Sequence, residues 1–227
     1  MLNTLTTWRR TESDGESPGQ ALPRKRHARS WVAYAALACA SPMLASSAPN
    51  RTLNITDAAF RCITEMTRVR HFYVDNLAGN LQGTLAVANS ASGGAYPVGS
   101  VLQLVPTEAM VKREKGFSPA TNDWEFFALD VDKDGTRILS RGFVEVNNRF
   151  GGNCFACHIK ARPQWDLVCD NSHGCDPIPI TRAMSGALQR TDPRCKSQEP
   201  VSAADAEALK QLGEVVKGIQ AANAAKH

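Results

Sequence analysis

The sequence predicts a mainly β protein of the α+β class. We expect an antiparallel sheet of about five to six strands, an N-terminal helix, a Cys-x-x-Cys-His segment after the last strand and a C-terminal helix. Short segments rich in β-branched and aromatic residues fill the middle of the chain, and Gly, Pro, Asn and Asp separate them. Before and after this region, apolar residues recur three or four positions apart, as on one face of a helix. At 227 residues the chain has room for one domain with attached extras.

The N-terminal helix is expected soon after residue 51. Thr56 or Asp57 would cap it, and Ala59, Ile63 and Met66 fall on one face at spacings of four and three. The period then changes to that of strands. The expected strands are 69–75, 83–88, 100–105, 109–114, 124–131 and 136–146.

Turn and helix signals complete the pattern. The Asp134-Gly135 pair between the last two strands predicts a hairpin turn. A short helix is expected over 182–190, after Thr181. The last 25 or so residues predict a helix with Ser202 and Asp205 as a capping box. Its apolar face carries Leu209, Leu212, Val216 and Ile219.

Residues 1–48 have the composition of an N-terminal extension with an export signal. A basic region, Arg24–Arg29, precedes an apolar stretch of about 14 residues, too short to span a membrane comfortably, and small residues follow it. We therefore expect an exported protein in the bacterial periplasm, with the alternative of a membrane anchor if the signal is not cleaved. Cys39 adds lipidation as a minor alternative. The remaining parts are a main domain over 51–180 and a C-terminal helical extension over 181–227.

The net charge of +4 is concentrated in this leader. Six of the 26 basic residues but only three of the 22 acidic residues precede residue 31, so the rest of the chain is close to neutral. We therefore expect no nucleic-acid partner and, after signal cleavage, no membrane partner. A basic cluster could steer an acidic redox partner protein, although a solvated surface is the more usual explanation. It consists of Arg182, Arg190, Arg194 and Lys196.

Seven cysteines divide into three groups. Cys39 belongs to the leader, and Cys154 and Cys157 belong to the Cys-x-x-Cys-His segment. The other four are an even number in an apparently exported chain, which predicts two disulfides with three connectivities open. They are Cys62, Cys169, Cys175 and Cys195. A zinc site is the alternative. It would use Cys169, His173, Cys175 and Cys195.

The Cys-Phe-Ala-Cys-His segment at 154–158 predicts one covalently attached haem c. Two thiols, Cys154 and Cys157, add across the vinyl groups of the porphyrin, and the adjacent His158 then lies beneath the iron as its proximal ligand. A redox dithiol would require a βαβ context, which is missing here. Half of a zinc site would require a second pair of ligands nearby. Met184 and His173 are candidate sixth ligands, but each fits a structural role better, so we expect a pentacoordinate iron.

The order of motifs resembles the cytochrome P-460 family, which includes the beta-type cytochromes c-prime. The similar pieces, within about residues 55–170, are YPVGSVLQLV (96–105), NDWEFFAL (122–129), NCFACH (153–158) and WDLV (165–168). The resemblance implies an antiparallel β fold with a pentacoordinate c-type haem. The stretch 171–227 lies outside it.

The resemblance also separates two branches of the family. Members that oxidise hydroxylamine join a lysine to the porphyrin, and Leu104 stands at that position here, with Lys112 and Lys115 as the next lysines. The carboxylate those enzymes place after the haem motif is not evident in Ile159–Arg162. The resemblance therefore implies the c-prime-like branch, with an apolar distal pocket that accepts a neutral diatomic.

Candidates for the distal wall are Phe72, Leu104, Phe126 and Phe127. Neighbouring residues of a strand point to opposite faces, so only one of Phe126 and Phe127 can face the haem. The expected function is binding or transforming nitric oxide or another small nitrogen oxide at a monohaem c-type cytochrome. The alternatives are a hexacoordinate electron-transfer cytochrome c and a hydroxylamine-oxidising enzyme with a haem–lysine cross-link. The sequence does not decide whether the protein is an enzyme.

Overall fold

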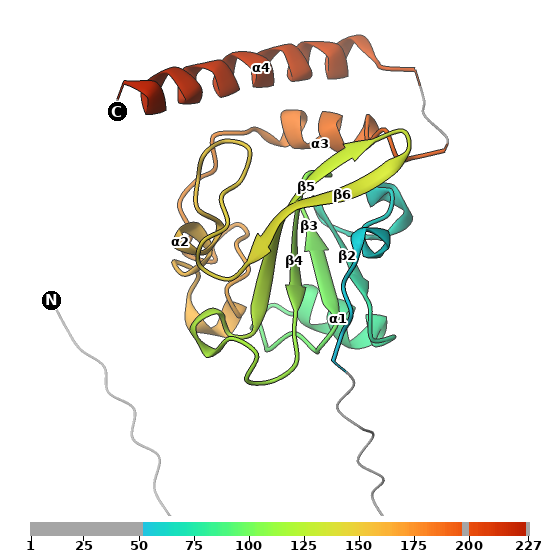
Figure 1. The fold of residues 1–227 in the computed structure, drawn as a ribbon, viewed down its shortest axis with the longest axis vertical. Coiled ribbons are helices and arrows are strands. Elements are labelled where there is room, and N and C mark those ends of the chain that lie inside the picture. The colour runs from blue at the N-terminus through green and yellow to red at the C-terminus, as the bar shows by residue number, and fades with distance from the viewer. Residues whose placement is uncertain (1–51, 197–199, 226–227) are drawn as a thin grey trace, which may run out of the picture. The chain divides into compact units, whose positions relative to one another are not determined.

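The computed structural model describes residues 52–196 and 200–225, so the expected leader with Cys39 lies outside the described residues. A six-stranded antiparallel sheet forms the centre, and each strand pairs with the next one along the chain (Figure 1). The strands are β1 (Thr67–Val69), β2 (Phe72–Asn76), β3 (Ser100–Gln103), β4 (Glu108–Lys112), β5 (Trp124–Asp132) and β6 (Gly135–Gly142). This architecture confirms the predicted α+β, mainly β class.

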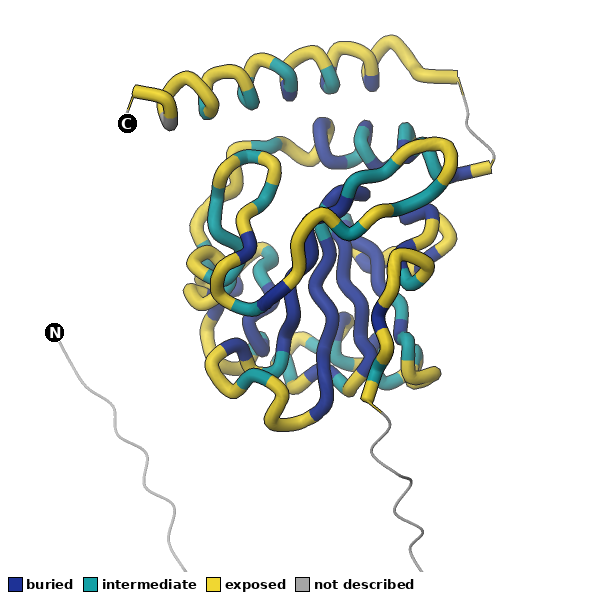
Figure 2. The backbone as a smooth tube through the Cα atoms, viewed as in Figure 1, coloured by how far each residue is buried: buried dark blue, intermediate teal, exposed yellow. Residues whose placement is uncertain are grey.

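Both faces of the central strands are buried, as the dark blue of β3 to β5 in Figure 2 shows. Because side chains alternate along a strand, β5 sends Phe126 to one apolar cluster and Phe127 to the other. The first cluster, on the face covered by α1 (Leu81–Ala88) and α2 (Cys154–His158), is named the site face below. The second contains Phe60 and Ile63 from the N-terminal segment and is named the back face.

The predicted strand over 83–88 is wrong, because this segment belongs to α1. The side chain of Asn80 accepts a hydrogen bond from the Gly83 N–H and caps the helix. Leu81, Leu85 and Ala88 then recur at spacings of four and three and pack in the site-face cluster. The expected strand, 83–88, left out Asn80 and Leu81. Without these two residues the segment shows neither the helix cap nor the helical spacing of its apolar residues.

The N-terminal helical segment consists of two 3₁₀ turns, Asp57–Ala59 and Ile63–Glu65, rather than one continuous α-helix. Phe60 lies between them with extended backbone angles. The N–H of Ile63 donates to the carboxylate of Asp192 at 2.9 Å, so a distant side chain replaces the partner that a continuous helix would supply. Tertiary contacts thus override the helical period here.

The remaining elements lie within two residues of the predicted ones, except that the last expected strand, 136–146, ends at Gly142. The expected strand 69–75 is divided into β1 and β2 by a turn at Arg70, whose φ is 52°. Pairing of Asp132 with Gly135 confirms the predicted hairpin. Two helices end the chain, α3 (Arg182–Arg190), capped by Thr181, and α4 (Ala203–Ala224). None of the helices in the described ranges is long and apolar enough to span a membrane.

Candidate functional site

The Cys-x-x-Cys-His segment forms the one-turn helix α2, which is tied to the chain that follows β6. The Asn153 side chain accepts from the Ala156 N–H at 2.9 Å and donates to the Val144 carbonyl at 2.8 Å. The Cys154 N–H donates to the Val146 carbonyl at 2.9 Å. Residues three and four apart on a helix are neighbours, so Cys154, Cys157 and His158 share one side of this turn.

Cys154 and Cys157 carry free thiols, whereas the four other described cysteines form two disulfides. The pairs are Cys62–Cys195 and Cys169–Cys175. This connectivity was one of the three that the sequence left open. It excludes the zinc alternative in this structure, because the three cysteine sulfurs of that site are oxidised.

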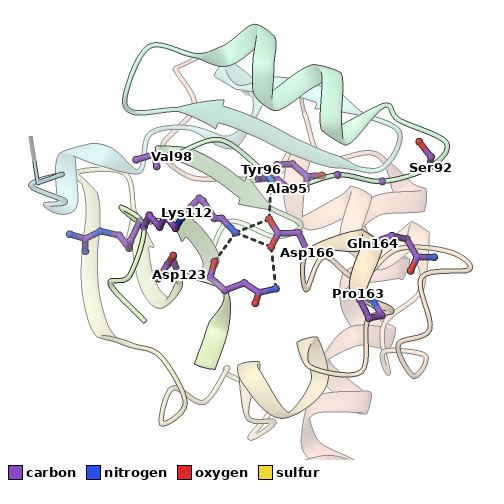
Figure 3. Close-up of a pocket in the computed structure, with 14 residues that line it drawn as sticks. Ser92, Ala95, Tyr96, Val98, Lys112, Asp123, Pro163, Gln164 and Asp166 are labelled. Carbon is purple, nitrogen blue, oxygen red and sulfur yellow. Dashed lines mark hydrogen bonds and ion pairs between the residues drawn. The ribbon is translucent and has the colours of Figure 1, made fainter. Parts of the chain in front are cut away.

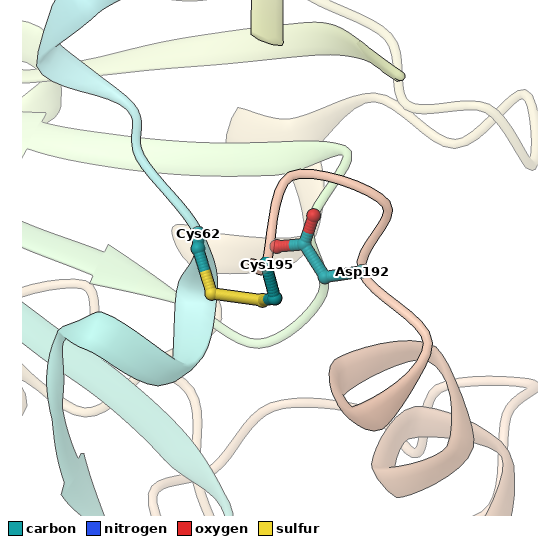
Figure 4. Close-up of side chains that lie close together, drawn as sticks. All are labelled: Cys62, Asp192 and Cys195. Carbon is teal, nitrogen blue, oxygen red and sulfur yellow. A yellow bond between two sulfur atoms is a disulfide. The ribbon is translucent and has the colours of Figure 1, made fainter. Parts of the chain in front are cut away.

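Asp192 lies beside the disulfide of Cys62 and Cys195, in a group that resembles a metal-ligand set (Figure 4). The two sulfurs are bonded to each other, and the carboxylate of Asp192 is paired with the guanidinium of Arg194 at 2.6 Å. The group is therefore a buried covalent and ionic connection between the N-terminal segment and the loop that follows α3.

The pKa of the Cys154 thiol differs from that of a cysteine in a redox-active dithiol. Burial, and then the nearby charge of Glu108, raise the pKa of Cys154 to about 12. Reactive dithiols instead need a lowered pKa, because the thiolate is the nucleophile. Cys154 thus remains a protonated thiol at neutral pH, which does not fit the redox-dithiol alternative.

His158 has one ring nitrogen engaged by the backbone. Its Nδ1 lies 2.7 Å from the Leu167 carbonyl oxygen, which can only accept, so Nδ1 carries the hydrogen. Burial lowers the pKa of His158, and the bond to Leu167 partly offsets this. The neutral ring therefore keeps the lone pair of Nε2 for a ligand. Histidines that bind metals usually have this arrangement, with the second nitrogen donating to a carbonyl or carboxylate.

Apolar side chains of the sheet lie next to α2. The ring of Phe126 is 5.2 Å from the ring of His158, centroid to centroid. Phe72 and Leu104 belong to the same site-face cluster as Cys154. Phe126 thus gives His158 an apolar neighbour, and the two free thiols with the histidine lone pair are a donor set that could hold a porphyrin and its iron.

Phe127, the fourth candidate for the distal wall, is not at this site. It lies on the back face, with its ring centroid 4.9 Å from that of Phe60 and the guanidinium of Arg141 over it. The alternation of β5 requires that only one of the two phenylalanines face α2, and that one is Phe126.

Glu108 is a site-face residue that the sequence analysis missed. It begins β4 and, by alternation, lies on the same face as Met110 of the site-face cluster. Its Oε1 is buried without a hydrogen-bond partner among the described residues. Burial raises the pKa of Glu108 to about 7, and the charge of Arg149 partly opposes this. Alternation along β4 could have placed Glu108 on this face, but the strand expected from the sequence began one residue later, at 109.

Lys112 and Asp166 form a buried ion pair at the base of a cavity of about 660 Å³ (Figure 3). The Nζ of Lys112 lies 2.8 and 2.7 Å from the two carboxylate oxygens and 2.6 Å from the Asn122 carbonyl. Lys115 lines the same cavity, whose wall contains neither the thiols nor His158. The structure thus gives Lys112 an ion-pair role rather than that of a cross-linking lysine.

The candidate sixth ligands have structural roles. His173 stacks on Trp165 with ring centroids 3.8 Å apart, and its Nδ1 lies 2.6 Å from the Val168 carbonyl. Met184 is buried in α3, where its sulfur accepts from the Thr181 N–H at 3.4 Å.

Two arginines of the basic cluster expected from the sequence form ion pairs with carboxylates. They are Arg190 with Asp205 and Arg194 with Asp192.

Comparison with models of protein families, with curated proteins and with solved structures finds no match for this chain. The resemblance to the cytochrome P-460 family therefore stays a prediction from its motifs.

Proposed function

We propose that this protein is an exported c-type monohaem cytochrome that binds or transforms small nitrogen oxides, such as nitric oxide, at a pentacoordinate iron. Cys154 and Cys157 would carry the haem as thioethers, and the Nε2 of His158 would ligate the iron. One observation carries the proposal: two free thiols and a histidine with its Nδ1 already bonded share one helical turn, while the other described cysteines are in disulfides.

When bound, the haem supplies an iron that can take up a neutral diatomic molecule or change its oxidation state. Phe126, beside His158, would exclude water from the side of the iron that His158 occupies, and Phe72 and Leu104 remain the candidates for the wall of the opposite, ligand-binding side. An apolar wall on that side would disfavour anions and polar dioxygen states and accept a neutral diatomic. The structural roles of His173 and Met184 support a free sixth position.

The two alternatives receive less support. An electron carrier with a hexacoordinate iron needs a ligand that the expected candidates do not readily offer. A hydroxylamine-oxidising enzyme needs a lysine at the porphyrin, but Leu104 has no amine and Lys112 is paired with Asp166.

Two disulfides support the proposed location in the periplasm. Such bonds form and persist in oxidising compartments and are rare in the cytosol. Attachment of haem to a Cys-x-x-Cys-His segment also takes place outside the cytoplasmic membrane. The free cysteines of this segment and the two disulfides are therefore both consistent with the periplasm.

An absorption spectrum of the ferrous protein with and without nitric oxide tests the proposal. We expect a high-spin spectrum that changes when nitric oxide is added, because the sixth position is open. A low-spin spectrum that ignores nitric oxide would favour the electron carrier. A strongly red-shifted Soret band would favour the cross-linked enzyme.

A further inference from the structure

We propose that the buried Lys112–Asp166 pair positions the Leu167 carbonyl against His158 and thereby sets how strongly His158 donates to the iron. Asp166 is then a positioning residue that acts through its neighbour in the chain. The inference rests on the proposed function, because it takes His158 as the proximal ligand.

The backbone between the pair and His158 is in an unfavourable conformation. Asp166 has φ 49° and Leu167 has φ 62°, so two consecutive residues with side chains are left-handed. L-amino acids other than glycine seldom adopt this conformation, with Asn and Asp as occasional exceptions, so Leu167 in particular is unusual there. Such a conformation persists only where surrounding contacts over-determine it.

Those contacts converge on Asp166 from three parts of the fold (Figure 3). Its carboxylate accepts from Lys112 of β4, from the Tyr96 N–H at 2.8 Å and from the Asn122 side chain at 3.3 Å. Its backbone carbonyl accepts from Trp124 Nε1 of β5 at 2.7 Å. Both ends of Asp166 are thus fixed to the sheet or to the loops beside it.

Fixing Asp166 fixes the peptide that follows. The Leu167 carbonyl is one residue away, and it is the group that accepts from His158 Nδ1 at 2.7 Å. A firm acceptor at Nδ1 makes the imidazole a stronger electron donor through Nε2. A stronger donor favours the ferric over the ferrous iron, so this contact would lower the reduction potential.

Stability alone is a poor explanation for this pair. The side chains of Lys112 and Asp166 are only 10% and 7% exposed, and two such charges are expensive to remove from water. Apolar residues of similar volume often serve a buried site equally well. A carboxylate with three donors can define the direction of a backbone segment, which an apolar side chain cannot.

The test uses the haem-loaded protein with Asp166→Asn, which keeps the size of the side chain and removes its charge. We expect the midpoint potential to shift in the positive direction and the iron–histidine vibration of the ferrous protein to move to lower frequency. The matched control is Asp192→Asn, which breaks the buried pair with Arg194 beside a disulfide instead. The control should lower stability and leave both readouts unchanged.

Trp124→Phe is a second variant in case Asp166→Asn does not fold. It removes the indole donor to the Asp166 carbonyl and keeps an aromatic ring in the core, so it should shift both readouts in the same direction by less. If the foldable variants shift the potential and the vibration no more than Asp192→Asn does, the inference is overturned while the proposed function stands. A wild-type protein without covalent haem overturns the proposed function itself, and the inference with it.

Discussion

At the scale of single residues, Glu108 is the site-face group that changes its charge near neutral pH. Its pKa rises from the usual 4.5 to about 7 because burial disfavours the carboxylate. Between these two values the folded protein holds a proton that the unfolded chain has released. The contribution of Glu108 to the free energy of unfolding should therefore fall by up to about 3 kcal/mol as the pH rises from 4.5 to 7, and level off above 7.

Glu108→Gln removes this titration, so the fall in stability that Glu108 causes should be missing from its pH profile. The measurement is urea unfolding at a series of pH values from 4.5 to 8. Glu207→Gln, on the exposed surface of α4, is the control and should keep the wild-type profile. Superimposable pH profiles for wild type and Glu108→Gln would show that Glu108 is not held in its protonated form.

Phe126 and Phe127 form a pair of neighbouring residues with opposite environments. Phe126 lies beside His158, and Phe127 packs against Phe60 on the back face. Because both are buried, replacing either with Leu should cost roughly 1–2 kcal/mol of unfolding free energy. Only Phe126→Leu should alter the absorption spectrum of the haem-loaded protein. A spectral change of equal size in Phe127→Leu would contradict the assignment of faces.

Some of the site's residues can be found in the sequence, because their chemistry is carried by side chains at a fixed spacing. Cys154, Cys157 and His158 are of this kind. The Leu167 carbonyl is not, since it is a backbone atom whose direction depends on an ion pair formed from distant parts of the chain. Alternation predicts that Phe126 and Phe127 oppose each other, but only tertiary packing decides which of them meets α2.

At the scale of elements, the strands and the C-terminal helices were predictable, because turn residues separate clear apolar patterns. The failures lie where short apolar segments are ambiguous. The segment 83–88 contains two β-branched residues, yet a cap at Asn80 and the spacing from Leu81 to Leu85 make it helical. The N-terminal segment has a helical period, yet a disulfide and the Ile63–Asp192 hydrogen bond hold it as two short turns.

The two disulfides should differ in their contribution to stability. Cys62–Cys195 joins the N-terminal turns to the loop after α3 across 133 residues, whereas Cys169–Cys175 spans six. In the chain-entropy model the long loop contributes about 5 kcal/mol and the short one about 2 kcal/mol. Urea unfolding of Cys62→Ser/Cys195→Ser and of Cys169→Ser/Cys175→Ser should show this order. A larger loss from the second double variant would contradict the prediction.

At the scale of the whole molecule, the site combines three separate regions of the chain. The sheet supplies Phe126, α2 supplies the thiols and His158, and the following loop supplies the Leu167 carbonyl. The Lys112–Asp166 pair ties that loop back to β4.

The central claim is that haem is covalently bound through Cys154 and Cys157, and haem staining after denaturing electrophoresis tests it most directly. The wild-type protein, produced in the periplasm of cells that can mature c-type cytochromes, should keep a haem-stained band. Cys154→Ala/Cys157→Ala should lose the band, while Cys169→Ser/Cys175→Ser, which breaks a disulfide instead, should keep it. A wild-type band without stain, or a stained band in Cys154→Ala/Cys157→Ala, would contradict the claim.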